Sequence, residues 1–559
     1  MQGCSCTRVL VACWMLLSCA EALSAERSPQ QETRDRLQQQ ERLREQQRLD
    51  ESFLPERGVK TPEPESEDTD GPCFPINDVI LQSPDDAPLP FPGWLREAAR
   101  FADPECVRTS DIRRVQQRLS ERLIEHGYVT SRVLLPEQDI SDGEISFLIV
   151  PGRVGGHSGE GMPDRLVRSA MPGRTGHLLN LRDLEQAVEN LGRVPGLDAR
   201  LDLLPGERQG ETVILGRGEW PRRTRGSLVV NSERHDGMLH STARAGFEVA
   251  SPLGMTDRLS LAVNSDLDRE ISDRAQGASL DYELVLGHWF TSLGARHQEY
   301  ENTVPGFFQD FDSEGHTRTA TAELGRVIRR TAHTRVALAG LLGHNDVRNR
   351  LQDATVRVSS YRLTTAGLRV DFRHHGRLSQ WGGGLTLEHG YAGGPATRLP
   401  DDLEIAEQRS NRLRLFTQFS RPMPALPGEL STTLVAQFSN DRLFPLQQIS
   451  LASASAVRGF EGMSVTANSA FHGSVEYSHG FESAFPGLHW RPFVALDGGR
   501  IPGKSNEPDD IRMASAVAGI GAAYRRTEFT LEAAHPIAAF SSRMPDSDLV
   551  LRGRLALQF

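Results

Sequence analysis

The sequence feature that most constrains the fold is an alternation of apolar and polar residues, which recurs from about residue 222 to the C-terminus. Successive side chains of a β-strand point to opposite faces, so the alternation predicts strands with one apolar face. The other face carries arginine and glutamate, which a barrel with lipid outside and water inside requires. The alternation is clear in two segments: Leu413, Leu415 and Phe419 among Arg412, Arg414 and Gln418, and Leu551, Leu555, Leu557 and Phe559 among Arg552, Arg554 and Gln558.

Residues 222–559 have room for about 16 strands of about 10 residues with connections of similar length. We therefore predict a transmembrane β-barrel of about 16 antiparallel strands. No long apolar run follows the first two dozen residues, which excludes a helical membrane protein. The 63 basic and 74 acidic side chains give a net charge of −11, and a general nucleic-acid binder would need a basic face.

The N-terminus predicts export from the cytoplasm. Arg8 precedes an apolar stretch over residues 9–19 and then small residues, the pattern of a secretory signal peptide over residues 1–25. Cleavage after Ala22 and cleavage after Ala25 fit equally well. An alternative interpretation is a lipoprotein site with a lipid on Cys19.

Cys73 and Cys106 are the two cysteines outside the signal segment. In an exported chain, two cysteines predict one disulfide. The alternative is a pair of free buried thiols.

Residues 26–52 are almost entirely Gln, Glu and Arg. Ser28 with Gln31 three residues later forms a capping box, which predicts a helix. Its three leucines are six residues apart and form no stripe, so the helix is polar on every side. It is either a solvated leader or a helix that stands in a water-filled lumen. Residues 53–72 are rich in proline and acidic residues and predict an extended linker.

Residues 73–153 predict a small α/β module. We expect Ser110 to cap a helix that ends at Gly127, followed by strands over residues 128–135 and 145–150. Residues 154–221 repeat this layout. Asn180 is expected to cap a helix over residues 181–191, with short strands at 199–204 and 212–215.

Catalytic motifs are poorly supported. Residues 498–505 match the phosphate-binding pattern G-x-x-x-x-G-K-S, but Pro508 and acidic residues follow where that loop must open a helix. We therefore expect a turn between barrel strands at this segment. The adjacent pair His374 and His375 would point to opposite faces of a strand and is a poor metal site. No enzyme, catalytic residue, metal or cofactor is predicted.

Arg458 is the charged residue in the motif Val457, Arg458, Gly459 and Phe460, within a long loop between predicted strands. Asp497 lies on a later apolar strand. A buried arginine in a barrel needs a carboxylate, so the pair could hold the loop tip inside the lumen. The alternative is that both residues are unrelated surface charges.

This order of elements resembles the outer-membrane transporters of two-partner secretion, of the haemolysin-activator and filamentous-haemagglutinin type. The resemblance covers nearly the whole mature chain. It implies two polypeptide-transport-associated (POTRA) domains, an inward-folded loop around residues 450–465 locked by Asp497, and a C-terminal residue used in barrel assembly. The residues that carry it are Gly127, Tyr128, Pro136, Gln138 and Asp139 in the first module, Asn180 and Leu184 in the second, Val457–Phe460, and Phe559. One departure is Ala495, where the superfamily usually has Phe or Gly.

The resemblance also implies a function. The chain would lie in the outer membrane of a Gram-negative bacterium, in contact with outer-membrane lipid, with the POTRA domains in the periplasm. These domains would capture a large unfolded exoprotein, such as an adhesin, cytolysin or contact-dependent toxin, and the barrel would translocate it without ATP. Barrel assembly machinery would recognise the C-terminal strand. Alternatives are an insertase for other barrels, which usually has more periplasmic modules, and a passive porin, which would need none.

Overall fold

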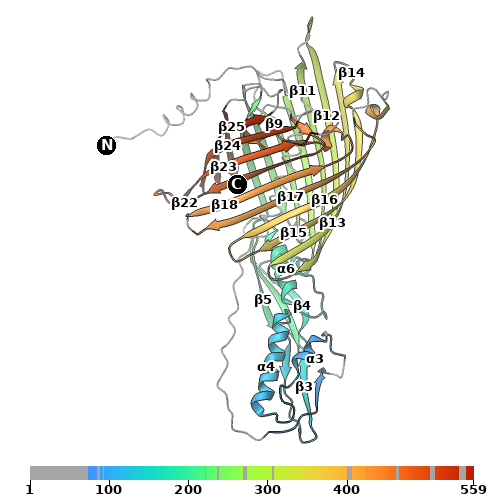
Figure 1. The fold of residues 1–559 in the computed structure, drawn as a ribbon, viewed down its shortest axis with the longest axis vertical. Helices are drawn as coiled ribbons and strands as arrows, with labels where there is room; N and C mark the ends of the chain where they lie inside the picture. The colour runs from blue at the N-terminus through green and yellow to red at the C-terminus, as the bar shows by residue number, and fades with distance from the viewer. Residues whose placement is uncertain are drawn as a thin grey trace, which may run out of the picture.

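A computed structural model describes most of the chain from Cys73 onwards as a barrel with two small modules stacked below it (Figure 1). The predicted signal peptide, polar helix and linker over residues 1–72 lie outside the described residues. The described ranges are 73–84, 88–91, 93–220, 222–235, 238–267, 274–304, 307–398, 406–424, 426–460, 465–503, 510–540 and 549–559.

The first module is a three-stranded sheet covered by two helices. The sheet order is β1-β3-β2, with β1 parallel and β2 antiparallel to β3. One face of α4 is buried through Ile112, Val115, Leu119 and Leu123, as the apolar spacing predicts. The elements are β1 (Asp78–Gln82), α3 (Trp94–Ala98), α4 (Thr109–Glu125), β2 (Arg132–Leu134) and β3 (Glu144–Val150).

Several details of this module differ from the sequence prediction. Helix α4 begins one residue before Ser110, and Arg108 is its N-cap, because the Asp111 carboxylate accepts the Arg108 N–H at 2.9 Å and closes the first turn. The strand predicted over residues 128–135 shortens to β2. Strand β1 and helix α3 were not predicted, since neither shows a clear period.

The second module repeats the arrangement. Its sheet order is β4-β6-β5, with β4 parallel and β5 antiparallel to β6. Asn180 is the N-cap of α6 as predicted, and its side-chain oxygen accepts the Arg182 N–H at 2.9 Å. Strand β4 and helix α5 were missed, because β4 is glycine-rich and α5 is only two turns long. The elements are β4 (Arg153–Glu160), α5 (Asp164–Ala170), α6 (Leu181–Gly192), β5 (Asp198–Pro205) and β6 (Glu211–Glu219).

Sixteen long antiparallel strands of the described residues form the closed barrel, which confirms the predicted fold class. Pairing of β26 with β7 closes the sheet, and β14 (Ala354–Thr355) and β22 (Phe481–Glu482) extend it locally. The sixteen strands are β7 (Thr224–His235), β8 (Met238–Ala250), β9 (Asp257–Asp266), β10 (Arg274–Leu286), β11 (Trp289–Val304), β12 (Phe311–Arg330), β13 (Thr334–Leu351), β15 (Tyr361–His375), β16 (Gln380–Gly393), β17 (Arg409–Met423), β18 (Gly428–Phe438), β21 (Ala470–Ser478), β23 (Leu488–Ile501), β24 (Ile511–Tyr524), β25 (Thr527–Phe540) and β26 (Val550–Gln558).

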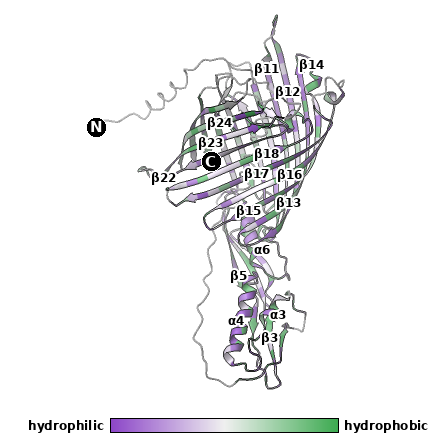
Figure 2. Cartoon of the chain, viewed as in Figure 1, coloured by the Kyte–Doolittle hydropathy of each residue, from purple (hydrophilic) through white to green (hydrophobic). Residues whose placement is uncertain are grey.

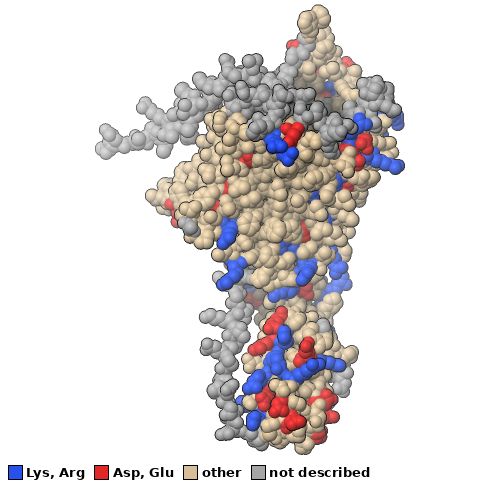
Figure 3. Space-filling model, in the orientation of Figure 1, with Lys and Arg blue, Asp and Glu red and all other residues tan. Residues whose placement is uncertain are grey.

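The two faces of the wall differ as the alternation predicts. Leu293, Leu342 and Leu368 point outward and are more than half exposed, whereas Arg296 and Glu323 point inward and are buried. Hydrophobic and hydrophilic residues alternate along the strands in Figure 2, and few charged side chains interrupt the outer wall at mid-height in Figure 3. In the described part of the chain no helix is long and apolar enough to cross a membrane. The strands carry the apolar surface.

Aromatic side chains mark the barrel end nearest the modules. Trp289 and Trp381 lie near the starts of β11 and β16, and each is about half exposed. The Arg326 guanidinium lies 5.3 Å from the Trp289 ring centroid. Such residues anchor a barrel at the boundary between lipid and water.

The last residue of the chain meets the start of the first barrel strand. Phe559 and Gly226 exchange two backbone hydrogen bonds of 2.9 and 3.0 Å. The Phe559 ring lies over Gly226, and a Cβ there would be 2.1 Å from the ring and would displace it. The two ends of the barrel sequence are therefore fastened together at the end nearest the modules.

The segment that matches the phosphate-binding pattern is not a turn at its start. Gly498, Gly499, Arg500 and Ile501 belong to β23 and pair with β24. Residues in a paired strand direct alternate amides to their neighbours and cannot cradle a phosphate. The prediction of a turn is wrong for these four residues, and residues 504–509 lie outside the described ranges.

Cys73 and Cys106 form a disulfide, as predicted. Beside it, Phe74 and Val107 exchange backbone hydrogen bonds of 2.9 and 2.8 Å, so the disulfide ties the start of the module to the residues just before α4.

The double variant Cys73→Ser/Cys106→Ser should lower the free energy of unfolding of this module by about 3–4 kcal/mol. Faster hydrogen exchange in β1 and α4, with no change in the barrel strands, would be the expected readout. Equal protection in both proteins would contradict it.

Candidate functional site

The connection between β18 and β21 folds into the barrel. It carries η5 (Pro445–Gln447), β19 (Ile449–Ser450), η6 (Arg458–Phe460) and β20 (Thr466–Ala467). Val457 and Phe460 are buried against inward side chains of the wall, including Phe416 and Met513. A loop with this much buried apolar surface is held inside the lumen and does not project from the barrel rim.

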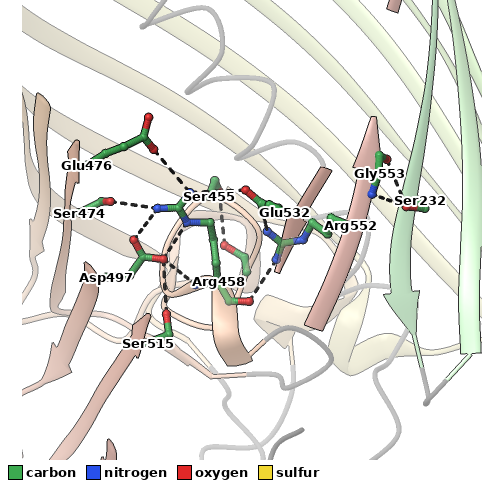
Figure 4. Close-up of polar contacts among 11 residues, drawn as sticks. Ser232, Ser455, Arg458, Ser474, Glu476, Asp497, Ser515, Glu532, Arg552 and Gly553 are labelled. Carbon is green, nitrogen blue, oxygen red and sulfur yellow. Dashed lines mark hydrogen bonds and ion pairs between the residues drawn. The ribbon is translucent and has the colours of Figure 1, made fainter. Parts of the chain in front are cut away.

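Arg458 and Asp497 form a bidentate ion pair at the tip of this loop (Figure 4). The Arg458 Nε and Nη2 atoms each donate to a different Asp497 oxygen at 2.8 Å, and the Arg458 backbone N–H donates at 3.1 Å. The Ser515 hydroxyl adds a contact at 3.4 Å. Bidentate, charge-assisted pairs of this kind fix both position and orientation. The two residues are therefore not unrelated surface charges.

Two further carboxylates surround the same guanidinium. Glu532 lies 3.5 Å and Glu476 3.7 Å from Arg458 Nη1. Arg552 forms an ion pair with Glu532 and donates to the Arg458 carbonyl oxygen at 3.2 Å. The sequence alternation placed Arg552 on an inward face, but it gave no means of pairing residues on β21, β25 and β26 with a loop.

The remaining residues of the motif fit the loop against the wall. Val457 and Phe460 lie in the apolar cluster, and Gly459 lies against β24 and β25. A Cβ on Gly459 would be 2.7 Å from the Ser515 Cβ and 2.9 Å from the Pro536 nitrogen. Only glycine allows this approach, and the approach brings Arg458 within reach of Asp497.

The N-terminal part of the loop is held by the preceding strands of the wall. Phe444 is buried and its ring lies 4.4 Å from that of Tyr361 on β15. Arg412 and Gln437 donate to the Gln447 carbonyl oxygen at 3.0 and 2.8 Å. Two sets of wall contacts, on β15–β18 and on β21–β26, therefore hold the loop.

Two of the predicted POTRA residues, Gly127 and Asn180, lie at the junction of the modules, and a third, Leu184, lies in the second module. Gly127 ends α4 with φ +87°, and its carbonyl oxygen accepts the Leu181 N–H at 2.7 Å. The Asn180 amide nitrogen donates to the His126 carbonyl oxygen at 2.9 Å, while Leu184 packs in the second core. These contacts join the end of α4 to the start of α6.

The other four POTRA residues shape the first module. The Tyr128 ring lies 5.0 Å from that of Phe91. The Gln138 side chain pairs with the backbone of Ser146 on β3, accepting at 2.6 Å and donating at 2.8 Å, and it also donates to the Pro136 carbonyl oxygen at 3.3 Å. The Ser141 N–H donates to Asp139 at 2.9 Å and lowers the pKa of that carboxyl.

No group of three or more His, Cys, Asp or Glu side chains in the described ranges could hold a metal ion. The site is an ion-paired loop inside a polar lumen, and the fold is a barrel preceded by two small α/β modules.

Comparison with known families identifies the class. Residues 221–522 match the model described as haemolysin secretion/activation protein ShlB/FhaC/HecB, residues 74–152 match an ShlB-type POTRA domain, and residues 154–205 match a POTRA domain. The chain belongs to the haemolysin secretion/activation family, whose members are outer-membrane transporters of two-partner secretion. Its barrel lies in the outer membrane and its two POTRA domains lie in the periplasm.

Individual relatives agree with this assignment. The outer membrane transporter CdiB of Escherichia coli is 27% identical over 473 residues, which are 80% of this chain and 76% of the relative. The hemolysin transporter protein ShlB of Serratia marcescens is 25% identical, over 87% of this chain and 86% of the relative. The solved structure of CdiB from Escherichia coli, 24% identical, matches the fold with a TM-score of 0.86 and covers 96% of this chain and 100% of its own.

Arg458→Ala should reduce secretion of the partner at least tenfold while the barrel stays inserted, because the loop tip loses its bond to Asp497. Arg458→Lys is the matched control, because lysine keeps the positive charge but cannot form the bidentate pair. We expect this variant to retain only part of the secretion. Secretion is measured by quantitative immunoblotting of the medium, and insertion by heat-modifiable migration in gels. Secretion by Arg458→Ala at the level of the unaltered chain would contradict a role for the lock.

Proposed function

We propose that this chain recognises an unfolded partner exoprotein in the periplasm through its POTRA domains and translocates it through the barrel to the cell surface without ATP. The observation that carries the proposal is a loop held inside a polar lumen by ionic contacts to the wall, in a barrel preceded by two modules with open sheet edges. Glu476 and Glu532 lie beside the same guanidinium, so we assign to Arg458 an exchange of carboxylate partners as the loop moves aside.

Capture of the exoprotein is assigned to the edge of the second sheet. Among the described residues, β5 pairs with β6 on one side and has no strand on the other. Leu203 and Leu204 on β5 are 40% and 42% exposed. An extended segment can add to such an edge through main-chain hydrogen bonds, with little demand on its sequence.

Passage through the barrel is supported by the lining of the lumen. Inward charges are paired with one another, as in the ion pairs of Arg369 with Glu323 and of Arg412 with Glu388. A lining of paired charges offers an unfolded chain few apolar surfaces to which it could adhere. ATP is absent at that membrane, so we assign the drive to folding of the exoprotein outside the cell, which prevents its return.

The test is quantitative proteomics of medium, cell surface and outer membrane from cells with and without this chain. Loss of one very large surface or secreted protein, with other barrels unchanged, is the expected result and would identify the partner. Broad depletion of outer-membrane barrels would instead indicate an insertase of the same superfamily. No change in any exported protein would leave a passive porin and would end the proposal.

The double variant Leu203→Asp/Leu204→Asp should weaken binding of the identified exoprotein about tenfold or more. The two carboxylates would replace the apolar surface on which an apolar segment of the exoprotein packs. Ile124→Asp is the matched control, since Ile124 is a similarly exposed apolar side chain on α4, in the first module. Binding of a fluorescent N-terminal fragment of the exoprotein to the full-length chain in detergent gives the affinity. Equal weakening by both variants would count against the β5 edge.

Deletion of residues 26–52 tests the second interpretation of the polar segment, in which it stands in the lumen at rest. Removal should raise the conductance of single channels in planar bilayers without abolishing export, because the lumen loses an obstruction. Replacement of residues 26–52 by a Gly/Ser sequence of equal length is the control, because it keeps the length of the tether and removes the predicted polar helix. Unchanged conductance would exclude a plug.

A further inference from the structure

We propose that Glu189 is a positioning residue that fixes the second POTRA domain across the mouth of the barrel, and that this fixed docking directs a captured exoprotein into the lumen. The inference rests on the proposed function. It concerns a residue on α6 that contributes to neither the loop lock nor the β5 edge.

The Glu189 carboxylate lies among four guanidinium groups. It forms an ion pair with Arg330, lies 3.4 Å from Arg335 and from Arg193, and lies 4.0 Å from Arg373. Arg193 belongs to its own module. The other three belong to the ends of β12, β13 and β15, so a single carboxylate ties α6 to three barrel strands.

The carboxylate stays charged in this environment. Glu189 is only 6% exposed, and burial alone would raise the pKa of its carboxyl. The guanidinium groups of Arg335, Arg193 and Arg330 outweigh the burial and lower that pKa to about 2. The ionic contact is therefore complete at neutral pH.

Neighbouring contacts extend the docking to other turns. The Asn190 side chain, fully buried, donates to the carbonyl oxygens of Ala170 at 2.7 Å and Gly287 at 2.8 Å. The Gly287 N–H donates to the Ser169 carbonyl oxygen at 2.9 Å, and the Thr256 N–H donates to the Ser169 hydroxyl at 2.9 Å. Helices α5 and α6 thus contact the barrel from the start of β9 to the end of β15.

Glycine is required where the module meets the wall. Gly287 has φ +58°, and a Cβ there would lie 2.7 Å from the Cα of Pro172. The turn between β10 and β11 therefore lies directly against the connection from α5 to α6. The module and the barrel are in close contact, as Figure 1 shows for α6 below the barrel wall.

This docking sets the direction of the β5 edge. Asp198 at the start of β5 pairs with Glu219 at the end of β6, and β7 begins at Thr224. The start of β5 is therefore its end nearest the barrel, and a strand added along β5 leads to the barrel mouth. One short covalent connection, between β6 and β7, joins the module to the barrel. The module could rotate about this connection unless a second attachment held it. Glu189 provides the charged part of that attachment, beside the hydrogen bonds of Asn190 and Ser169.

Glu189→Gln is the informative variant, because it preserves shape and leaves the surrounding arginines without their common counter-charge. Glu185→Gln is the matched control. Glu185 lies one turn earlier on α6, is more exposed and reaches Arg330 only at 3.7 Å. Removing one partner from a buried ionic cluster is far more damaging than removing a solvated one.

The experiment measures docking, binding and secretion in the full-length chain. Spin labels on Gln209→Cys in the module and Arg421→Cys on β17 report the distance between module and barrel by pulsed electron resonance. We expect a narrow distribution of the distance between the two labels for the unaltered chain and for Glu185→Gln, and a broad one for Glu189→Gln. Secretion by Glu189→Gln should fall at least tenfold, with affinity for the exoprotein fragment changed less than twofold.

A second substitution separates charge coupling from general damage. Arg335→Gln in the Glu189→Gln chain removes one of the excess cations and should narrow the distribution and recover secretion at least threefold. A narrow distribution for Glu189→Gln, or normal secretion despite a broad one, would overturn the inference. Equal loss of binding and secretion would assign Glu189 to capture and also overturn it. Failure of the unaltered chain to bind the exoprotein would refute the proposed function instead.

Discussion

Closure of the sheet is the constraint on which the rest of the structure depends. In lipid, every backbone N–H and C=O group must be satisfied within the protein, and a closed barrel satisfies them all. The pairing of β26 with β7 completes this closure. A barrel of sixteen strands then encloses a lumen wide enough to hold water, so charged side chains can line it and a loop can enter it. The alternation in the sequence, the ion pairs of the inner wall and the place of Arg458 are consequences of one closed sheet.

Two ionic clusters of opposite composition lie along the path that the exoprotein would take. At the loop tip, Arg458 lies among the carboxylates of Asp497, Glu476 and Glu532. At the mouth, the single carboxylate of Glu189 lies among several guanidinium groups. The first cluster, together with the buried side chains of Val457 and Phe460, holds a loop that would have to move for the exoprotein to pass. The second is reinforced by buried amide and hydroxyl contacts on two helices and suits permanent attachment.

Much of the fold and part of the site could be predicted from the sequence. Local periodicity was enough for the apolar face of α4, for the Asn180 cap and for the barrel strands, because each is a short-range pattern. Strand β4 and helix α5 carry weak patterns and were missed. Arg458 and Asp497 could be paired because a known family carries both. The sequence did not reveal the partners of Glu476, Glu532 and Glu189. Those partners are set by strand register and module docking, which act between residues far apart in the chain.

The bond between Phe559 and Gly226 has a consequence for how the protein is made. The first strand of the barrel gains its second neighbour only when the last residues of the chain arrive, more than three hundred residues later. Contacts between such distant residues form slowly. Until β26 pairs with it, β7 therefore has an open edge, and unpaired edges aggregate. Biogenesis of this transporter must keep the unfinished sheet soluble until its final strand is delivered.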